Sequence, residues 1–73
     1  MSKYCLVGVD GNALSIMGYT AKALRNEGLG DKVEEMYEKA TSGTYTKLLI
    51  VCDDYIQMAN AKAEENGYVD DDE

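Results

Sequence analysis

The hydrophobic pattern divides the chain into one short alternating segment and three longer segments. Residues 3–9, Lys-Tyr-Cys-Leu-Val-Gly-Val, are rich in β-branched and aromatic residues and end at Asp10-Gly11-Asn12, a strong turn sequence. This pattern predicts a β-strand over residues 3–9. A lone strand leaves its backbone N–H and C=O groups without partners. The strand therefore requires a second strand, from the same chain or from a second copy.

From Asn12 onward the apolar and small residues follow the spacing of a helix, which Asp10 or Asn12 can cap. Gly28 is typical of the left-handed residue that ends a helix, with Leu29 folding back on the last turn. Gly18, inside this helix, costs about 1 kcal/mol relative to Ala and indicates close packing against another backbone. The residues that share the predicted buried face are Ala13, Ile16, Met17, Thr20, Ala21 and Leu24.

A second helix is predicted from Asp31 to the stop sequence Ser42-Gly43. Asp31 and Glu34 have the spacing of a capping box, in which two side chains satisfy the free N–H groups of the first turn. The predicted buried face carries Leu29, Val33, Met36, Tyr37 and Ala40.

Residues 47–52 fit two structures. Leu48 to Cys52 could be a buried strand that pairs with residues 3–9 in the same chain, but the apolar spacing continues as a helical stripe to Asn66-Gly67. Length and the absence of an internal turn signal favour a helix, capped by Thr44 or Thr46. The predicted fold class is α+β and mostly helical, in the order β-α-α-α, with the strand paired across a homodimer.

Length and charge bound the possible functions. With 73 residues the chain forms one domain, whose core supplies only about 3–5 kcal/mol of net stability. We expect residues 1–63 to form that domain and residues 64–73 to be an acidic, disordered tail. The tail carries six acidic residues and no Lys or Arg, whereas residues 1–63 carry eight acids and seven bases. With no basic stripe, nucleic-acid binding is not expected.

The residue types also bear on catalysis, metals and location. The chain has no histidine, and its two cysteines, Cys5 and Cys52, form no metal-binding pair, so we expect no metal, no cofactor and no enzyme activity. Both cysteines are interpreted as reduced, buried thiols. No export signal and no stretch of about 18 apolar residues is present, which predicts a cytoplasmic protein that does not enter the membrane.

Two sets of residues are candidate binding groups. Gly8, Asp10, Gly11 and Asn12 place backbone N–H groups at a helix start, where phosphates and carboxylates often bind, although no complete phosphate motif is present. The alternative is a capped turn with no ligand. The candidates for a protein interface are Tyr4, Leu6, Tyr19 and Tyr45.

Two segments carry a resemblance to a known family. Residues 9–18, with Gly-Asn-Ala and then Ile-Met-Gly, and residues 40–45, Ala-Thr-Ser-Gly-Thr-Tyr, resemble short uncharacterised proteins of bacteria, phages and mobile elements. The likeness runs from residue 4 to residue 59 and implies a setting but no activity. It suggests a self-associating binding module with an unknown protein partner, as in accessory or anti-defence factors. The alternatives are a protein that binds or sequesters a phosphate or nucleotide at residues 8–13, and an acidic mimic that binds a basic protein.

Overall fold

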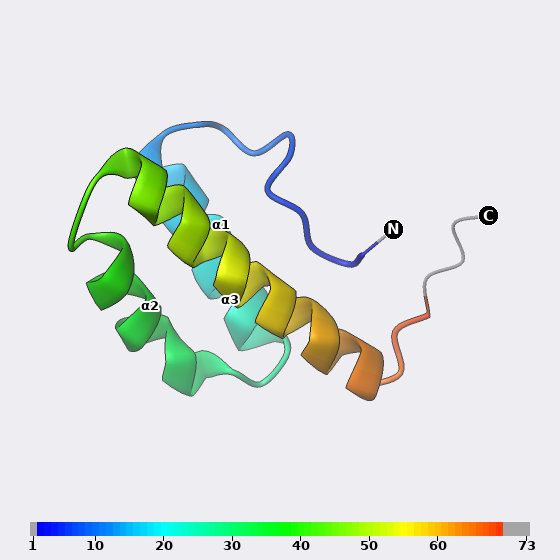
Figure 1. The fold of residues 1–73 in the computed structure, drawn as a ribbon. Coiled ribbons are helices and arrows are strands. Elements are labelled where there is room, and N and C mark those ends of the chain that lie inside the picture. The colour runs from blue at the N-terminus through cyan, green and yellow to red at the C-terminus, as the bar shows by residue number, and fades with distance from the viewer. Residues whose placement is uncertain (1, 70–73) are drawn as a thin grey trace.

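The computed structural model describes residues 2–69, which form an irregular N-terminal arm followed by three α-helices (Figure 1). The helices are α1 (Ala13–Asn26), α2 (Val33–Ala40) and α3 (Tyr45–Glu65), and a 3₁₀ turn at Gly30–Lys32 precedes α2. Nowhere in residues 2–69 does the chain form a β-strand. The predicted α+β class is therefore wrong, and this part of the chain is all-helical.

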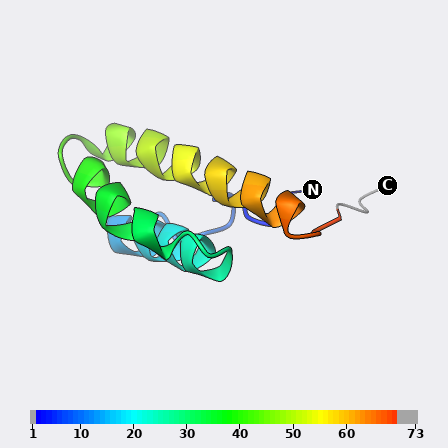
Figure 2. The same cartoon turned by 90° about the horizontal axis from the view of Figure 1, so that it is seen from below.

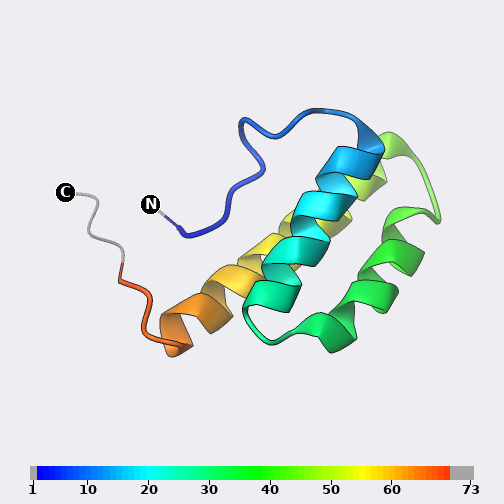
Figure 3. The same ribbon diagram turned by 180° about the vertical axis from the view of Figure 1, so that it is seen from behind.

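Helices α1 and α3 run in the same direction. Helix α2, which lies between them in the sequence, runs in the opposite direction beside them (Figure 1). Seen from below, α3 lies across the pair formed by α1 and α2 (Figure 2). The arm follows the side of α1 and α3 that is away from α2, as the view from behind shows (Figure 3). One face of each helix therefore turns toward a common core.

The predicted apolar stripes form that core. Leu24, Met36 and Ile56, one from each helix, are among the largest fully buried side chains. Thr20 is also fully buried, and its hydroxyl donates to the Ile16 carbonyl at 2.9 Å, which satisfies it within α1. The helical spacing therefore located the buried faces correctly.

The predicted ends of α1 are confirmed. The Asn12 side chain accepts a hydrogen bond from the Leu14 N–H at 2.8 Å, and Gly28 adopts a φ of 79°. The Leu29 N–H then donates to the Leu24 carbonyl at 2.8 Å. Only glycine adopts this left-handed conformation without a steric cost, which is why the helix stops there.

The helix over residues 47–52 is confirmed, and the alternative strand is wrong. The Thr44 side chain caps α3 by accepting from the Lys47 N–H at 3.2 Å. At the other end Gly67 has a φ of 102°, and the Tyr68 N–H donates to the Ala63 carbonyl at 2.9 Å. Helix α3 thus extends into the predicted tail of residues 64–73, of which residues 70–73 lie outside the described part. No described helix has the length and apolar character needed to cross a membrane.

Three local predictions are wrong. No side chain caps the start of α2, because Asp31 lies inside the 3₁₀ turn and the capping box with Glu34 does not form. Gly18 faces open space, since an added Cβ would meet no atom within 4 Å. Both cysteines are free, but only Cys52 is buried, whereas Cys5 is exposed on the arm.

Candidate functional site

The arm is held on the helices by side chains in place of a second strand. The Tyr4 N–H donates to Asn60 Oδ1 at 2.8 Å, and Asn60 Nδ2 donates to the Tyr4 carbonyl at 3.0 Å. The Cys5 N–H donates to the Tyr19 hydroxyl at 3.1 Å. Helices α1 and α3 thus provide partners for the Tyr4 N–H, the Tyr4 C=O and the Cys5 N–H, and the arm lies on the helices in place of the predicted strand shared across a homodimer.

A buried carboxylate joins the arm to the ends of α1 and α3. Glu27 is only 4% exposed. Its Oε2 accepts from the Tyr4 hydroxyl at 2.6 Å and lies 2.7 Å from Lys3 Nζ, and its Oε1 accepts from Asn66 Nδ2 at 3.1 Å. Every polar partner of this carboxylate is a donor, so its ionised form is the one that fits.

The electrostatics of this cluster follow from those contacts. The hydrogen bonds from Lys3, Tyr4 and Asn66, in that order of size, lower the pKa of Glu27 to about 2. The hydrogen bond between Lys3 and Glu27 raises the pKa of Lys3. The pKa of Tyr4 is also raised, mainly by burial and secondly by its hydrogen bond to Glu27. A carboxylate that stays ionised at neutral pH is a structural anchor and is poorly suited to general acid–base chemistry.

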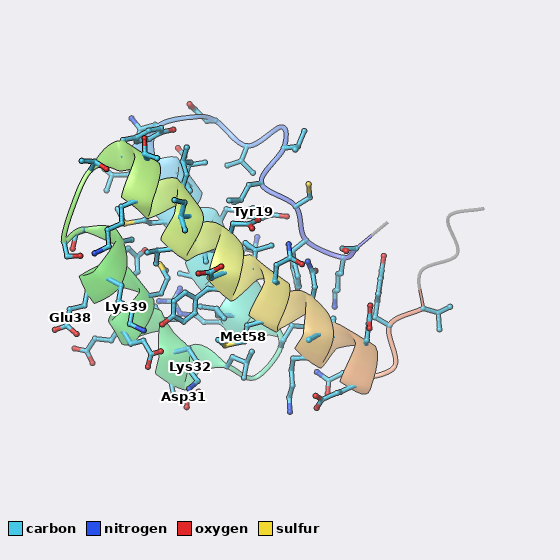
Figure 4. The ribbon with its side chains drawn as sticks, in the orientation of Figure 1. Tyr19, Asp31, Lys32, Glu38, Lys39 and Met58 are labelled. Carbon is cyan, nitrogen blue, oxygen red and sulfur yellow. The ribbon has the colours of Figure 1, made fainter. Side chains whose placement is uncertain are left out.

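A second tyrosine–carboxylate pair connects α2 with α3. The buried Tyr55 hydroxyl donates to Glu35, and the Lys39 ammonium lies 5.8 Å from the centre of the Tyr55 ring. Burial, and then the bond to Glu35, raise the pKa of Tyr55 to about 12, and the same bond lowers the pKa of Glu35. Lys39 is seen on α2, beside α3 (Figure 4). The pair fastens the short α2 to α3 by a charge-assisted hydrogen bond.

A groove of about 250 Å³ opens between the arm and α1. The rings of Tyr4 and Tyr19 meet edge to face along it, with centroids 6.4 Å apart and planes at 77°. Figure 4 shows Tyr19 between the helices and the arm. The lining residues are Lys3, Tyr4, Tyr19, Lys22, Ala23 and Asn26.

The predicted anion-binding turn is exposed and makes its hydrogen bonds within the chain. Asp10 Oδ1 accepts from the Asn12 N–H at 3.1 Å, and the Tyr45 hydroxyl donates to the Gly11 carbonyl. Gly8 has a φ of 92°. The Asn12 side chain, which caps α1, accepts from the Leu14 N–H, so this N–H is not available to a ligand. A ligand at Gly8, Asp10, Gly11 and Asn12 stays a prediction.

The predicted interface residues occupy different environments. Tyr4 is buried, and Leu6 and Tyr19 are half-buried against the core. Tyr45 is exposed beside the start of α1, with its hydroxyl on the Gly11 carbonyl. Tyr4 and Tyr19 line the same groove, whereas Leu6 and Tyr45 do not belong to it.

One exposed surface of α3 was not singled out from the sequence. We call it the outer face of α3 and define it as Ile50, Asp53, Asp54, Gln57 and Met58. Ile50 is 58% exposed and Met58 is 38% exposed. Ile50 lies opposite the side of α3 that enters the core, whereas Met58 lies at the edge of that side, where it is seen on the flank of α3 toward α2 (Figure 4). The signal was present, because Ile50 falls outside the apolar stripe of the predicted helix.

No protein-family model, curated protein or solved structure matches the chain. The family resemblance of residues 4–59 therefore stays a prediction. Functional inference rests on the geometry of the arm, the groove and the outer face of α3.

Glu27 and Asn60 are the residues of the arm cluster that sequence reasoning missed. Glu27 follows Thr20 and Leu24 on the buried stripe of α1, and Asn60 follows Ile56 on that of α3. A polar residue at a stripe position indicates a buried polar contact, because burial without a partner is costly. This signal identifies the position but not its partner.

Proposed function

We propose that the protein is a non-enzymatic binding module that contacts a partner protein through the outer face of α3. The observation that carries the proposal is the exposure of Ile50 on the side of α3 that faces away from the core, with the less exposed Met58 two turns further along the helix. Ile50 and Met58 enclose the polar residues Asp53, Asp54 and Gln57, and a mixture of exposed apolar and polar groups is common in protein-binding surfaces. Helix α3 has 21 residues and is therefore about 30 Å long, which is sufficient for a helical contact.

The charges of this face favour a basic partner. Asp53 and Asp54 are both exposed beside Ile50. A positively charged surface would complement them and speed association, whereas a second copy of the same face would bring like charges together. We therefore propose a basic protein as the partner of this face, in preference to the same face of a second copy.

The environments of two carboxylates and one thiol support a binding role. Glu27 and Glu35 each accept a hydrogen bond from a tyrosine hydroxyl and serve the fold. Burial raises the pKa of the Cys52 thiol, which disfavours the reactive thiolate. The proposed setting, the cytoplasm of a bacterium that carries a phage or mobile element, follows from the resemblance and the residue composition alone.

The test is capture of partners from a bacterial lysate by the immobilised full chain, followed by quantitative mass spectrometry. We expect proteins captured by the wild type to be lost with Ile50→Asp and retained with Leu14→Asp, an equally drastic change at an exposed position on α1. Equal capture by Ile50→Asp and the wild type would contradict the proposal. If the acidic-mimic alternative holds, deleting residues 70–73, which hold four of the six acidic residues of the tail, abolishes capture while Ile50→Asp leaves it intact.

Self-association is a second candidate, because two strongly exposed apolar residues lie on other elements. Val7 on the arm is 87% exposed and Leu14 on α1 is 74% exposed. A homodimer that uses them would leave the acidic face of α3 free. Sedimentation equilibrium of the 8.0 kDa chain over a range of concentrations tests this. A dimer mass that Leu14→Asp reduces to the monomer supports it, and a monomer mass at every concentration excludes it.

A further inference from the structure

The groove between the arm and α1 has the features of a ligand site separate from the proposed protein contact. The Tyr4 and Tyr19 rings form an apolar wall with a corner, because they meet edge to face with their planes at 77°. The side chain of Ala23, which is itself almost fully buried, adds only a methyl group to the lining and so leaves room above it. The volume, about 250 Å³, is just below the usual range of about 300–1,000 Å³ for small-molecule pockets. A ligand of one ring with one attached group therefore fits the groove by size.

The polar groups around the groove are mainly hydrogen-bond donors. The Tyr19 hydroxyl accepts from the Cys5 N–H, so its own proton remains available to a ligand. Lys22 brings an ammonium group, which has donors and no acceptor. The Asn26 amide adds two more donors together with one acceptor. A ligand that satisfies these groups must present acceptors.

The charges around the groove also favour a ligand with an acidic group. The Lys3 ammonium is compensated by Glu27 at 2.7 Å. By contrast, no salt bridge within residues 2–69 includes Lys22. Residues 1–63, which contain the groove, carry eight acids and seven bases, so the net charge of −7 of the whole chain comes mostly from residues 64–73 and does not offset Lys22 at the rim. Lys22 provides a local positive charge where an acidic group can be held.

We propose that this groove binds a small anion that carries one aromatic ring. The ring lies against Tyr4 and Tyr19, and its phosphate or carboxylate group accepts from Lys22 and the Tyr19 hydroxyl. The arm is part of the site, because it supplies Tyr4 and, through the Cys5 N–H, fixes the position of the Tyr19 hydroxyl. This site differs in location and in residues from the turn at residues 8–13.

Amide NMR titration of the full chain tests the proposal, with phenyl phosphate as the first probe. We expect saturable shifts of the Tyr19, Lys22, Ala23 and Asn26 amides, and weaker shifts with inorganic phosphate, which lacks the ring. Lys22→Gln should weaken phenyl phosphate binding about two- to fivefold, the range of one exposed ion pair. Arg25→Gln is the matched control, because it removes the same charge from the same helix outside the groove.

The outcomes separate the parts of the proposal. Benzoate that binds as well as phenyl phosphate identifies the ligand class as ring-bearing acids in general, and binding of phenyl phosphate alone identifies phosphate monoesters. Inorganic phosphate that binds as tightly as phenyl phosphate overturns the role of the tyrosine wall. Shifts that are absent from the groove, or an equal loss with Lys22→Gln and Arg25→Gln, overturn the site. These results are independent of Ile50 and therefore of the proposed protein partner.

Discussion

Replacing Asn60 with leucine tests the conclusion that a side-chain amide takes the place of a strand partner. Asn60 is 5% exposed and makes two hydrogen bonds with the backbone of Tyr4, one as acceptor and one as donor. Leucine has a similar volume but neither function. The Asn60→Leu variant therefore removes the hydrogen-bond partners of the Tyr4 N–H and C=O and leaves the shape of α3 nearly unchanged.

The expected cost follows from the two backbone groups that lose their partners. A buried polar group without a partner costs about 1–3 kcal/mol, so two such groups cost about 2–6 kcal/mol. Two effects reduce this sum: leucine gains apolar burial, and the arm can detach, which returns the Tyr4 backbone to water. The apolar gain is about 1.5–3 kcal/mol, so we expect a net loss of about 0.5–3 kcal/mol. For a core that supplies only about 3–5 kcal/mol, a loss in the upper part of this range is a large share of the stability.

Urea unfolding monitored by circular dichroism measures the loss, and hydrogen exchange of the Tyr4 amide shows whether the arm detaches. We expect the amide to be protected in the wild type and to exchange rapidly in Asn60→Leu, while the helical signal at low urea is kept. Gln57→Leu, an exposed position on the same helix, is the control and should change stability by less than about 0.5 kcal/mol. An unprotected Tyr4 amide in the wild type, or equal stability of Asn60→Leu and the wild type, would refute the reasoning.

Three further predictions concern single groups. Because the pKa of Glu27 is lowered from its ordinary value of 4.5 to about 2, its ionised form contributes stability above pH 4.5 that is lost as the pH falls toward 2. The urea midpoint should therefore fall over that range in the wild type and fall less in Glu27→Gln. Since the pKa of Tyr55 is raised from 10.0 to about 12, Tyr55→Phe should remove the last step of tyrosine ionisation in an alkaline ultraviolet titration, and Tyr45→Phe should leave it. Gly28→Ala should destabilise by about 1–2 kcal/mol because its φ is 79°, whereas Gly18→Ala, at an open helical position, should stabilise by about 0.5–1 kcal/mol in the same urea assay.

The helices could be predicted because their signals are local. Gly28 adopts the left-handed backbone that ends α1 without a steric cost, and the Thr44 side chain reaches only to the Lys47 N–H. The apolar spacing of α3 likewise continues without interruption across residues 47–52. Each of these signals involves residues within a few positions of one another, so no knowledge of the tertiary structure was needed.

The arm could not be predicted because its partners are distant in sequence. The alternation of residues 3–9 indicates a strand, yet Val7 is strongly exposed and Tyr4 is buried, because Asn60 and Glu27 decide which side chain turns inward. Asn60 lies 56 positions from Tyr4. A single sequence shows that Asn60 and Glu27 are polar residues on apolar stripes, but it does not show that both serve the same segment.

The way in which the arm is held has a consequence for both proposals. The described contacts that fix it are mostly polar and directional, with Tyr4 as its one buried apolar side chain. Such contacts specify one position of the arm, because a displaced arm would leave Glu27 and Asn60 buried without partners. The same contacts place Tyr4 beside Tyr19 and so shape one wall of the groove. The groove therefore depends on the arm, whereas none of the described hydrogen bonds and ion pairs that hold the arm involves Ile50 or Met58 on the outer face of α3. Asn60→Leu should accordingly abolish binding of phenyl phosphate while leaving capture of a protein partner unchanged under conditions in which the helices remain folded.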